Sequence, residues 1–408
     1  MATPAIISST NTSDNSGSGP GLLIALSTFF GVLVVFSCIR CFINKKNIDN
    51  LADQLNKIDD FLSNLEKLKP MRFSSEQLII ATEDFAHMLG AGGCGTVYKG
   101  SFPNSATVAV KVLRGSSDQQ IEAQFMAEVS TIGRIHHFNL VRLIGFCFEN
   151  SMQALVYEFM ENGSLDGFLF RNKERIPFDK LHEIALGTAK GIAYLHEECQ
   201  QRIIHYDIKP GNILLDQNLS PKVADFGLAK LCNRDATHVT MTGGRGRGTP
   251  GYAAPELWMP FPVTYKCDVY SYGMLLFEIV GRRRNLEFNL PESQEWFPKW
   301  VQEKFKKKEI DEIAKICEIE EDNGERAERM VKVALWCVQQ KPEMRPCMSS
   351  VVKMLGGGVE IISPPNPFAH MIDGMHTVDF LPFRNTNEES CKASCSGNVK
   401  ESVYSIYP

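Results

Sequence analysis

The sequence predicts an α+β protein preceded by a single transmembrane helix. Three observations lead to this prediction: an uncharged apolar stretch near the amino terminus, a glycine-rich loop between two strands, and a helix with an inward-facing carboxylate soon after that loop. The chain has 408 residues, enough for two or three units at about 150 residues each.

Composition excludes several classes of protein. Apolar residues make up 44% of the chain and charged residues 22%, which is ordinary for a globular protein and excludes a wholly disordered, collagen-like or polytopic membrane chain. The net charge of −5 gives no electrostatic basis for nucleic acid as a partner. The 12 cysteines lack zinc-ligand spacing, so we expect mostly reduced cytosolic thiols.

Residues 21–39 contain no charged side chain. As a helix they would be about 28 Å long, close to the hydrocarbon thickness of a bilayer. A cleaved signal peptide is disfavoured because the stretch is long and follows no basic residue, and a buried core helix remains the alternative. Basic residues Arg40, Lys45 and Lys46 follow, which predicts an external amino terminus and a cytosolic remainder. We therefore expect an extracellular stub at 1–20 and a single-pass transmembrane helix at 21–43 in contact with the lipid bilayer.

Residues 44–72 are expected to form an amphipathic juxtamembrane segment. Apolar residues recur there at spacings of three and four, at Ile48, Leu51, Leu55, Ile58, Leu62 and Leu65. This seam is shorter than three heptads, so self-association and docking on the membrane or the next domain both stay open. At the other end, glycines at 356–358 and the Ser363-Pro364-Pro365 run break periodicity, and we expect a disordered tail over 356–408.

The glycine-rich loop has the sequence Leu-Gly-Ala-Gly-Gly-Cys-Gly-Thr-Val at 89–97. A dinucleotide-binding loop would run into a helix, and a Walker A loop would end in Gly-Lys-Ser/Thr, whereas Thr96 follows Gly95 here. The loop therefore joins two strands. The next strand, 107–111, presents Ala109 and Lys111 on one face, which suits a flat base beside phosphates, although Lys111 alone would more simply be a lysine at a sheet edge.

A helix predicted over 121–135 carries Glu128 on its apolar face, between Phe125 and Ile132. An unpaired buried charge costs several kcal/mol, so Lys111 is its natural partner. Without a nucleotide cleft, Glu128 would more simply lie in water at the margin of the helix.

Three later segments complete the pattern. Residues 203–215 carry an acid, a cation and an amide between two apolar stretches, Asp225-Phe226-Gly227 follows 18 residues after Asp207, and 251–256 reads Gly-Tyr-Ala-Ala-Pro-Glu. In order, the segments resemble the Gly-rich loop, V-A-x-K strand, catalytic loop, D-F-G turn and A-P-E element of protein kinases.

The resemblance covers 73–355, and the surrounding sequence is similar to plant receptor-like kinases of the leaf-rust-resistance type. It implies the bilobal kinase fold, with a small antiparallel β lobe carrying one helix and a large helical lobe, at the plasma membrane. It also implies transfer of the ATP γ-phosphate to protein Ser and Thr hydroxyls, the acceptor class being suggested by Lys209 with Thr249. A co-receptor is a further implied partner.

The resemblance also assigns roles. Asp207 would accept the proton of the hydroxyl and Lys209 would steady the transferring group, while Asn212 and Asp225 would hold Mg²⁺. Lys111, held by Glu128, would contact the phosphates of ATP. The other ATP-binding residues implied are Leu89, Gly90, Ala91, Gly92, Gly93, Cys94, Gly95, Thr96, Val97, Ala109, Glu158, Met160 and Leu214. The apolar stack of an active cleft would comprise Ile132, Leu143, His205 and Phe226, and Glu256 would pair with Arg345.

Tyr206 departs from the family pattern, because many kinases have Arg at this place. That Arg would bind a phosphate on the activation segment, so we expect a non-RD kinase that depends less on phosphorylation, or one with weaker turnover. Candidate phosphorylation sites are Thr237, Thr240 and Thr242. The alternative to an enzyme is a pseudokinase scaffold, which would normally have lost one of the four residues Lys111, Asp207, Asn212 and Asp225.

Overall fold

The computed structural model describes residues 36, 39–43, 45–46 and 70–369, except 94, 103–106, 134, 150, 172–173, 234–247 and 260–261. The chain divides into two compact units, Met1–Lys67 and Leu68–Pro408. Within the described residues, no helix combines the length and apolarity needed to cross a bilayer. Most of the expected span at 21–43, and the whole apolar seam at 48–65, lie outside the described residues.

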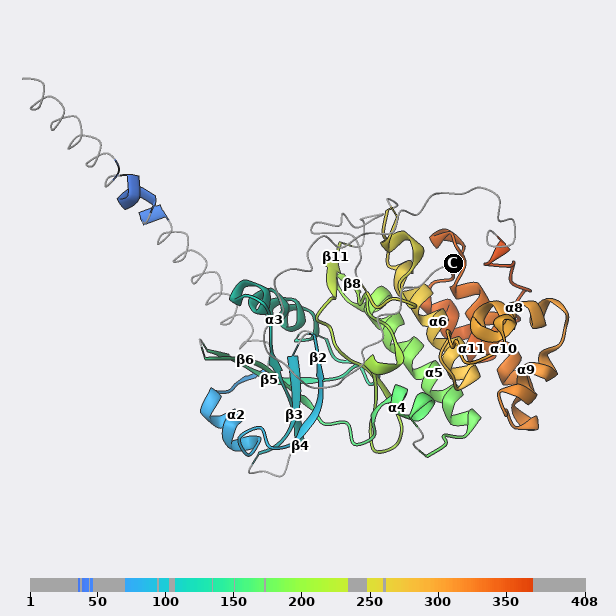
Figure 1. Ribbon diagram of the computed structural model, residues 1–408, viewed down its shortest axis with the longest axis horizontal. Coiled ribbons are helices and arrows are strands. Elements are labelled where there is room, and N and C mark those ends of the chain that lie inside the picture. Colours follow the sequence, from blue (N-terminus) through green and yellow to red (C-terminus); the bar gives the residue numbers. More distant parts are fainter. Residues whose placement is uncertain are drawn as a thin grey trace, which may run out of the picture. The chain divides into compact units, whose positions relative to one another are not determined.

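The first lobe of the second unit is built on a six-stranded sheet (Figure 1) with the order β1-β5-β6-β4-β3-β2. All neighbours are antiparallel except the short β1, which runs parallel to β5. The glycine-rich loop does join two strands, since Gly92 pairs with Gly95 where β2 meets β3. Gly95 has φ +145°, and a Cβ there would lie 2.2 Å from Val112 O, so only glycine fits. The strands are β1 (Met71–Arg72), β2 (Met88–Gly92), β3 (Gly95–Ser101), β4 (Thr107–Leu113), β5 (Leu143–Glu149) and β6 (Met152–Glu158).

The described residues of this lobe include two helices, α2 (Ser75–Ala81) and α3 (Asp118–Ile132). The expected bounds of α3, 121–135, were three residues too late. The helix begins earlier because the Ser117 hydroxyl accepts from Gln120 N and caps it, and it ends before Gly133. Its buried face includes Phe125 and Glu128 as expected.

The second lobe is mainly helical (Figure 1), and its central helix α6 is buried along most of its length. In the described part of this lobe, three short strands form one small sheet and two form another. The α-helices are α4 (Leu165–Phe170), α5 (Phe178–Ala193), α6 (Lys266–Gly281), α7 (Glu292–Glu295), α8 (Phe297–Lys306), α9 (Ile310–Ile316), α10 (Gly324–Cys337) and α11 (Met348–Leu355). The three-stranded sheet consists of β7 (Gly163–Ser164), β9 (Ile213–Leu215) and β10 (Pro221–Val223). The two-stranded sheet consists of β8 (Arg202–Ile204) and β11 (Lys230–Cys232). A π-helical turn, η1 (Tyr194–Glu198), extends α5, and 3₁₀ turns are η2 (Pro210–Asn212), η3 (Pro255–Leu257), η4 (Glu321–Asn323) and η5 (Pro342–Met344).

The folded domain extends beyond Leu355. Ile361 and Phe368 are 9% and 3% exposed, and the Trp336 indole donates to Ile362 O. The expectation of a disordered tail from 356 is therefore wrong for residues 356–369, because the glycine and proline signals that break a helix do not prevent an extended segment from packing. Residues 370–408 lie outside the described residues.

Candidate active site

A lysine of the β lobe joins two carboxylates. Lys111 Nζ on β4 lies 2.6 Å from Glu128 Oε1 on α3, which confirms the expected pair. It also lies 2.8 Å from Asp225 Oδ1, a contact that the sequence did not predict. Lys111 is 8% exposed and Glu128 is fully buried. One ammonium group thus connects strand, helix and the D-F-G turn.

The charge states of this cluster follow from burial and from the pairing. Burial alone would lower the pKa of Lys111, but the Glu128 and Asp225 carboxylates raise it above its ordinary value, so the ammonium stays charged. Burial opposes ionisation of Asp225, yet the adjacent Lys111 lowers the pKa of Asp225 to about 2. Burial raises the pKa of Glu128 to about 7. One cation is shared by two carboxylates, of which Glu128 is fully buried and Asp225 is only half-buried, so Glu128 carries most of the desolvation cost.

The catalytic-loop side chains form a second cluster. Thr249 Oγ1 donates to Asp207 Oδ1 at 2.5 Å, and Asn212 Nδ2 donates to Asp207 Oδ2 at 2.9 Å. Lys209 Nζ lies 2.8 Å from Asp207 Oδ2 and donates to Thr249 Oγ1 at 2.7 Å. The expected residues Asp207, Lys209 and Asn212 therefore do converge, together with Thr249 from the far end of the activation segment.

The backbone brings the two clusters together. Val223 pairs with Ile213 across β10 and β9, and Ala224 N donates to Asn212 O at 2.9 Å. Asp225, the next residue, is therefore adjacent to the catalytic loop. Both lobes contribute charged groups to this one region.

The catalytic loop is fixed by Asp268, whose role the sequence analysis missed. Its carboxylate accepts from the backbone N–H groups of His205 and Tyr206, both at 2.8 Å, and contacts His196 Nε2 at 2.9 Å. Tyr206 has φ +66°, an uncommon conformation for a bulky residue, and these bonds stabilise it. The available signal was an acidic side chain in a mostly apolar stretch, the one that forms α6.

The expected apolar stack is buried. His205 Nε2 contacts Ala224 O at 3.0 Å, and its ring lies 4.9 Å from the ring of Phe226. Phe226, Ile132 and Leu143 are at most 9% exposed. The D-F-G phenylalanine therefore packs inward against His205, and Asp225 points to Lys111.

The remaining expected ATP-binding residues differ in what they offer. Val97, Ala109 and Lys111 share one face of the sheet, because Val97 pairs with Lys111, and Val97, Ala109 and Leu214 are each half-buried. The Glu158 carboxylate turns away, accepting from Arg142 N at 2.8 Å and lying 3.3 Å from Lys222 Nζ, so only the main chain of Glu158 is available to a nucleotide.

For the other expected site residues, the structure gives only burial, or does not describe them. Leu89, Gly90, Ala91, Gly92 and Gly93 are exposed on the β2 side of the loop, Gly95 and Thr96 are buried on β3, and Met160 is buried after β6. Cys94 and the candidate phosphorylation sites Thr237, Thr240 and Thr242 lie outside the described residues. Tyr157, which precedes Glu158 on β6, carries a buried hydroxyl whose pKa is raised by burial and by the nearby Glu128 and Asp225 carboxylates.

The end of the activation segment is anchored to α6 through Tyr252. The Tyr252 hydroxyl donates to Glu278 Oε2 at 2.7 Å, Asn285 N donates to Glu278 Oε1 at 3.0 Å, and Ser271 Oγ donates to Tyr252 O at 2.8 Å. Glu278 is 3% exposed. Burial raises the pKa of Glu278 to about 7. The hydrogen bonds from Tyr252 and Asn285 and the charge of Arg284 oppose this rise, and the charge of Glu287 adds to it.

We expect Glu278 to make stability depend on pH. Between its ordinary pKa of 4.5 and about 7, the folded state holds a proton that the unfolded state releases, so stability falls as pH rises through this window. Urea unfolding of the parent should therefore lose about 2 kcal/mol more between pH 5 and pH 8 than Glu278→Gln does. Parallel pH profiles for the two proteins would contradict this assignment.

A buried ion pair closes the segment. Arg345 Nη1 and Nη2 donate to Glu256 Oε1 and Oε2 at 2.6 and 2.9 Å, which confirms the expected pair. Arg345 also donates to the carbonyls of Gln339, Gln340 and Lys266. The Nε, Nη1 and Nη2 groups of Arg345 therefore all donate to acceptors at this one buried place.

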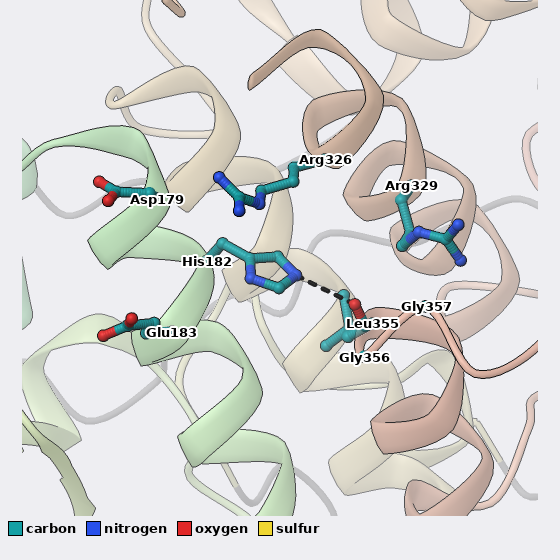
Figure 2. Close-up of a pocket in the computed structure, with 8 residues that line it drawn as sticks. All are labelled: Asp179, His182, Glu183, Arg326, Arg329, Leu355, Gly356 and Gly357. Atoms are coloured by element: carbon teal, nitrogen blue, oxygen red, sulfur yellow. Dashed lines mark hydrogen bonds between the residues drawn. The ribbon is translucent and has the colours of Figure 1, made fainter. Parts of the chain in front are cut away.

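A separate cavity of about 370 Å³ lies away from these clusters (Figure 2), among α5, α10 and the end of α11. His182 Nε2 contacts Leu355 O at 3.0 Å, and Arg329 donates to Met354 O at 3.1 Å. Burial lowers the pKa of His182, so the neutral ring acts as a donor. These side chains satisfy carbonyls at the end of α11, and we read the cavity as a by-product of this capping.

Comparison with known proteins agrees with this geometry. A family model described as protein tyrosine and serine/threonine kinase matches residues 84–355. The chain is 44% identical over 341 residues to the G-type lectin S-receptor-like serine/threonine-protein kinase SD2-5 of Arabidopsis thaliana, covering 82% of this chain and 40% of that protein. It is 45% identical over 322 residues to the rust resistance kinase Lr10 of Triticum aestivum, covering 76% of this chain and 50% of that protein.

A third relative is the leaf rust 10 disease-resistance locus receptor-like protein kinase-like 2.2 of Arabidopsis thaliana, 39% identical over 396 residues, which cover 94% of this chain and 57% of that protein. The chain thus belongs to the protein kinase family, whose members use ATP and a divalent metal ion. Within that family it is similar to plant receptor-like kinases, and it spans roughly half the length of these three relatives.

Proposed function

We propose that the chain is a membrane-anchored kinase that transfers the γ-phosphate of ATP to Ser and Thr hydroxyls of proteins. The observation that carries the proposal is the convergence of Lys111 and Asp225 from one cluster with Asp207, Lys209 and Asn212 from the other. The relatives are named as serine/threonine-protein kinases or receptor-like kinases, which supports the acceptor class.

Each side chain has a part in the reaction. The acceptor oxygen attacks the γ-phosphorus, the bond to the β,γ-bridging oxygen breaks, and ADP leaves. Asp207 takes the hydroxyl proton, and Lys209 offsets negative charge on the transferring group. Lys111, held by Glu128, binds the phosphates, while the backbone amides of the loop at 90–95 approach them closely. The protein forms no covalent bond to the substrate in this mechanism, so catalysis depends mainly on positioning the reactants and on stabilising charge.

Mg²⁺ would be held by Asn212 and Asp225. The residues fit this ion, because the Asn212 amide nitrogen donates to Asp207 and leaves the amide oxygen as a ligand, while the Asp225 side chain is 37% exposed beside Lys111. Carboxylate and amide oxygens are hard ligands of the kind that Mg²⁺ prefers. The ion would neutralise charge on the phosphate oxygens.

The anchor would be the helix at 21–43, with residues 1–20 outside the plasma membrane and the kinase domain in the cytosol. The uncharged stretch and its basic flank support this topology. The partners would then be the bilayer, protein substrates, and either a co-receptor or a second copy paired through residues 44–72. A scaffold without catalysis is not favoured, because the whole set of charged site residues is present.

Tyr206 would make the kinase less dependent on activation-segment phosphorylation. It is 2% exposed and packs in an apolar cluster that includes Cys232, near the start of the activation segment, and Ala254 and Leu257, at its end. Packing would thus hold both ends of the segment, in the role that a phosphate bound to Arg has in other kinases. This supports the non-RD assignment.

The test is phosphate transfer by the purified full chain, supplied with Mg²⁺, labelled ATP and dephosphorylated casein, before and after phosphatase treatment of the enzyme. We expect labelled Ser and Thr in casein in both samples, at initial rates that agree within about twofold. An untreated enzyme without transfer would contradict the kinase assignment. A rate at least tenfold lower after treatment would contradict only the role given to Tyr206.

A further inference from the structure

Residues 359–368, which we call the clasp, follow α11 and run along α10. They form no helix or strand between 360 and 366, yet side chains on and just after α10 bind their main-chain carbonyls. The bonds join Arg329 Nη1 to Val359 O (3.2 Å), Trp336 Nε1 to Ile362 O (2.9 Å) and Gln339 Nε2 to Pro365 O (2.9 Å).

The spacing of these bonds indicates a specific docking mode. The three acceptors are three residues apart, which is the repeat of a polyproline II helix, and the clasp contains Pro364, Pro365 and Pro367. Arg329 and Trp336 are seven residues apart, so they lie on one face of α10 about 10.5 Å from each other, close to the roughly 9.3 Å that three polyproline residues span. Proline-rich segments dock on aromatic-lined surfaces, and here Trp336 of the same chain supplies an aromatic side chain that also donates to the Ile362 carbonyl.

The clasp is anchored at its end by an aromatic contact. Phe368 is 3% exposed, and its ring lies 4.6 Å from that of Trp296, at an interplanar angle of 60°. Trp296 immediately precedes α8. The clasp therefore connects α10 to the start of α8.

One path of contacts leads from the clasp to the end of the activation segment. Gln339, whose side chain holds Pro365 O, accepts from Arg345 Nε through its own carbonyl at 2.7 Å. Arg345 in turn holds Glu256 through two bonds.

A second path starts at the other end of the clasp. Trp296 pairs with Leu286 in an antiparallel bridge, and Phe297 N donates to Asn285 O at 2.8 Å. Asn285 N donates to Glu278, which accepts from the Tyr252 hydroxyl. Both paths thus end in residues 249–257, the segment whose Thr249 contacts Asp207 and Lys209.

We propose that the clasp is a positioning segment that holds residues 249–257 in place for the protein acceptor. This rests on the proposed function, since it concerns the acceptor side of the same site. The clasp leaves the nucleotide side untouched, because neither path includes Lys111, Asp225 or the glycine-rich loop.

The test uses Phe368→Ala and Trp336→Phe in the full chain. The second substitution keeps an aromatic ring and removes only the indole donor. The matched control is Ile362→Ala, because Ile362 is 79% exposed and the substitution keeps its carbonyl. Steady-state kinetics with casein and ATP give the two KM values, and hydrogen exchange reports the Ala253 and Leu257 amides, which bond to Thr249 O and Ala254 O.

We expect both variants to raise the KM for casein about three- to tenfold, with the KM for ATP within about twofold and faster exchange at 249–257. Ile362→Ala should match the parent. Equal rises in both KM values, or unchanged KM for casein and unchanged exchange, would overturn the proposal. If Phe368→Ala does not fold, Trp336→Phe decides. Lack of transfer by the parent would contradict the kinase assignment, and exchange would then test the clasp alone.

Discussion

Asp207→Asn is expected to lower kcat for phosphate transfer by about 10³-fold, the scale of a positioned general base. The substitution retains the size of the side chain, so Thr249 and Lys209 keep a neighbour of similar shape, but an amide does not accept the hydroxyl proton. The nucleotide contacts proposed for Lys111 are unaffected. The KM for ATP should therefore stay within about threefold, as measured by initial rates with labelled ATP and casein.

Asp179→Asn is the matched control, because Asp179 is an exposed acid beside the cavity of Figure 2. It should transfer phosphate at the parental rate. An Asp207→Asn enzyme with more than a tenth of the parental kcat would show that Asp207 is not the base. The control also separates loss of one carboxylate in general from loss of this one.

Arg345→Met is expected to reduce the free energy of unfolding by about 3 to 5 kcal/mol, because it leaves the Glu256 carboxylate buried without its partner. Arg345 and Glu256 are 1% and 3% exposed, so water does not replace the lost bonds. The three carbonyls that Arg345 also holds would lose their donor. Chemical denaturation followed by circular dichroism measures the change.

A surface ion pair offers the comparison. Lys332 Nζ lies 2.8 Å from Glu328 Oε1, with side chains 27% and 42% exposed, and Lys332→Met should change the free energy of unfolding by no more than about 0.5 kcal/mol. The double variant Glu256→Leu/Arg345→Met should regain part of the loss, since it removes the orphaned charge. A loss below about 1 kcal/mol for Arg345→Met would mean that Glu256 finds another partner.

Much of the nucleotide side was predictable because its determinants are local or pairwise. Period-2 alternation gave Ala109 and Lys111 a common face, and the inward position of Glu128 on α3 required a cation, which Lys111 supplies. By contrast, α3 begins three residues earlier than expected because the Ser117 hydroxyl caps it. Hydrophobic periodicity does not indicate which of several nearby polar residues caps a helix.

The acceptor side was less predictable because its contacts join residues far apart in the chain. Thr249 reaches Asp207 across 42 residues, and Asp268 reaches His205 across 63. Neither pair has a periodic signature. The packed residues after 356 were missed for a related reason, since prolines and glycines mark the end of a helix but do not reveal whether an extended segment finds donors on another helix.

The π-helical turn at Tyr194–Glu198 gives the end of α5 a sensitivity to length. His196 lies within it and contacts Asp268 at 2.9 Å. Deleting one residue there would turn everything downstream by about 100° around the axis and swing the imidazole off its carboxylate, whereas exchanging an exposed side chain would preserve the phase. The number of residues in this turn therefore matters more for the position of the catalytic loop than the identity of its exposed side chains.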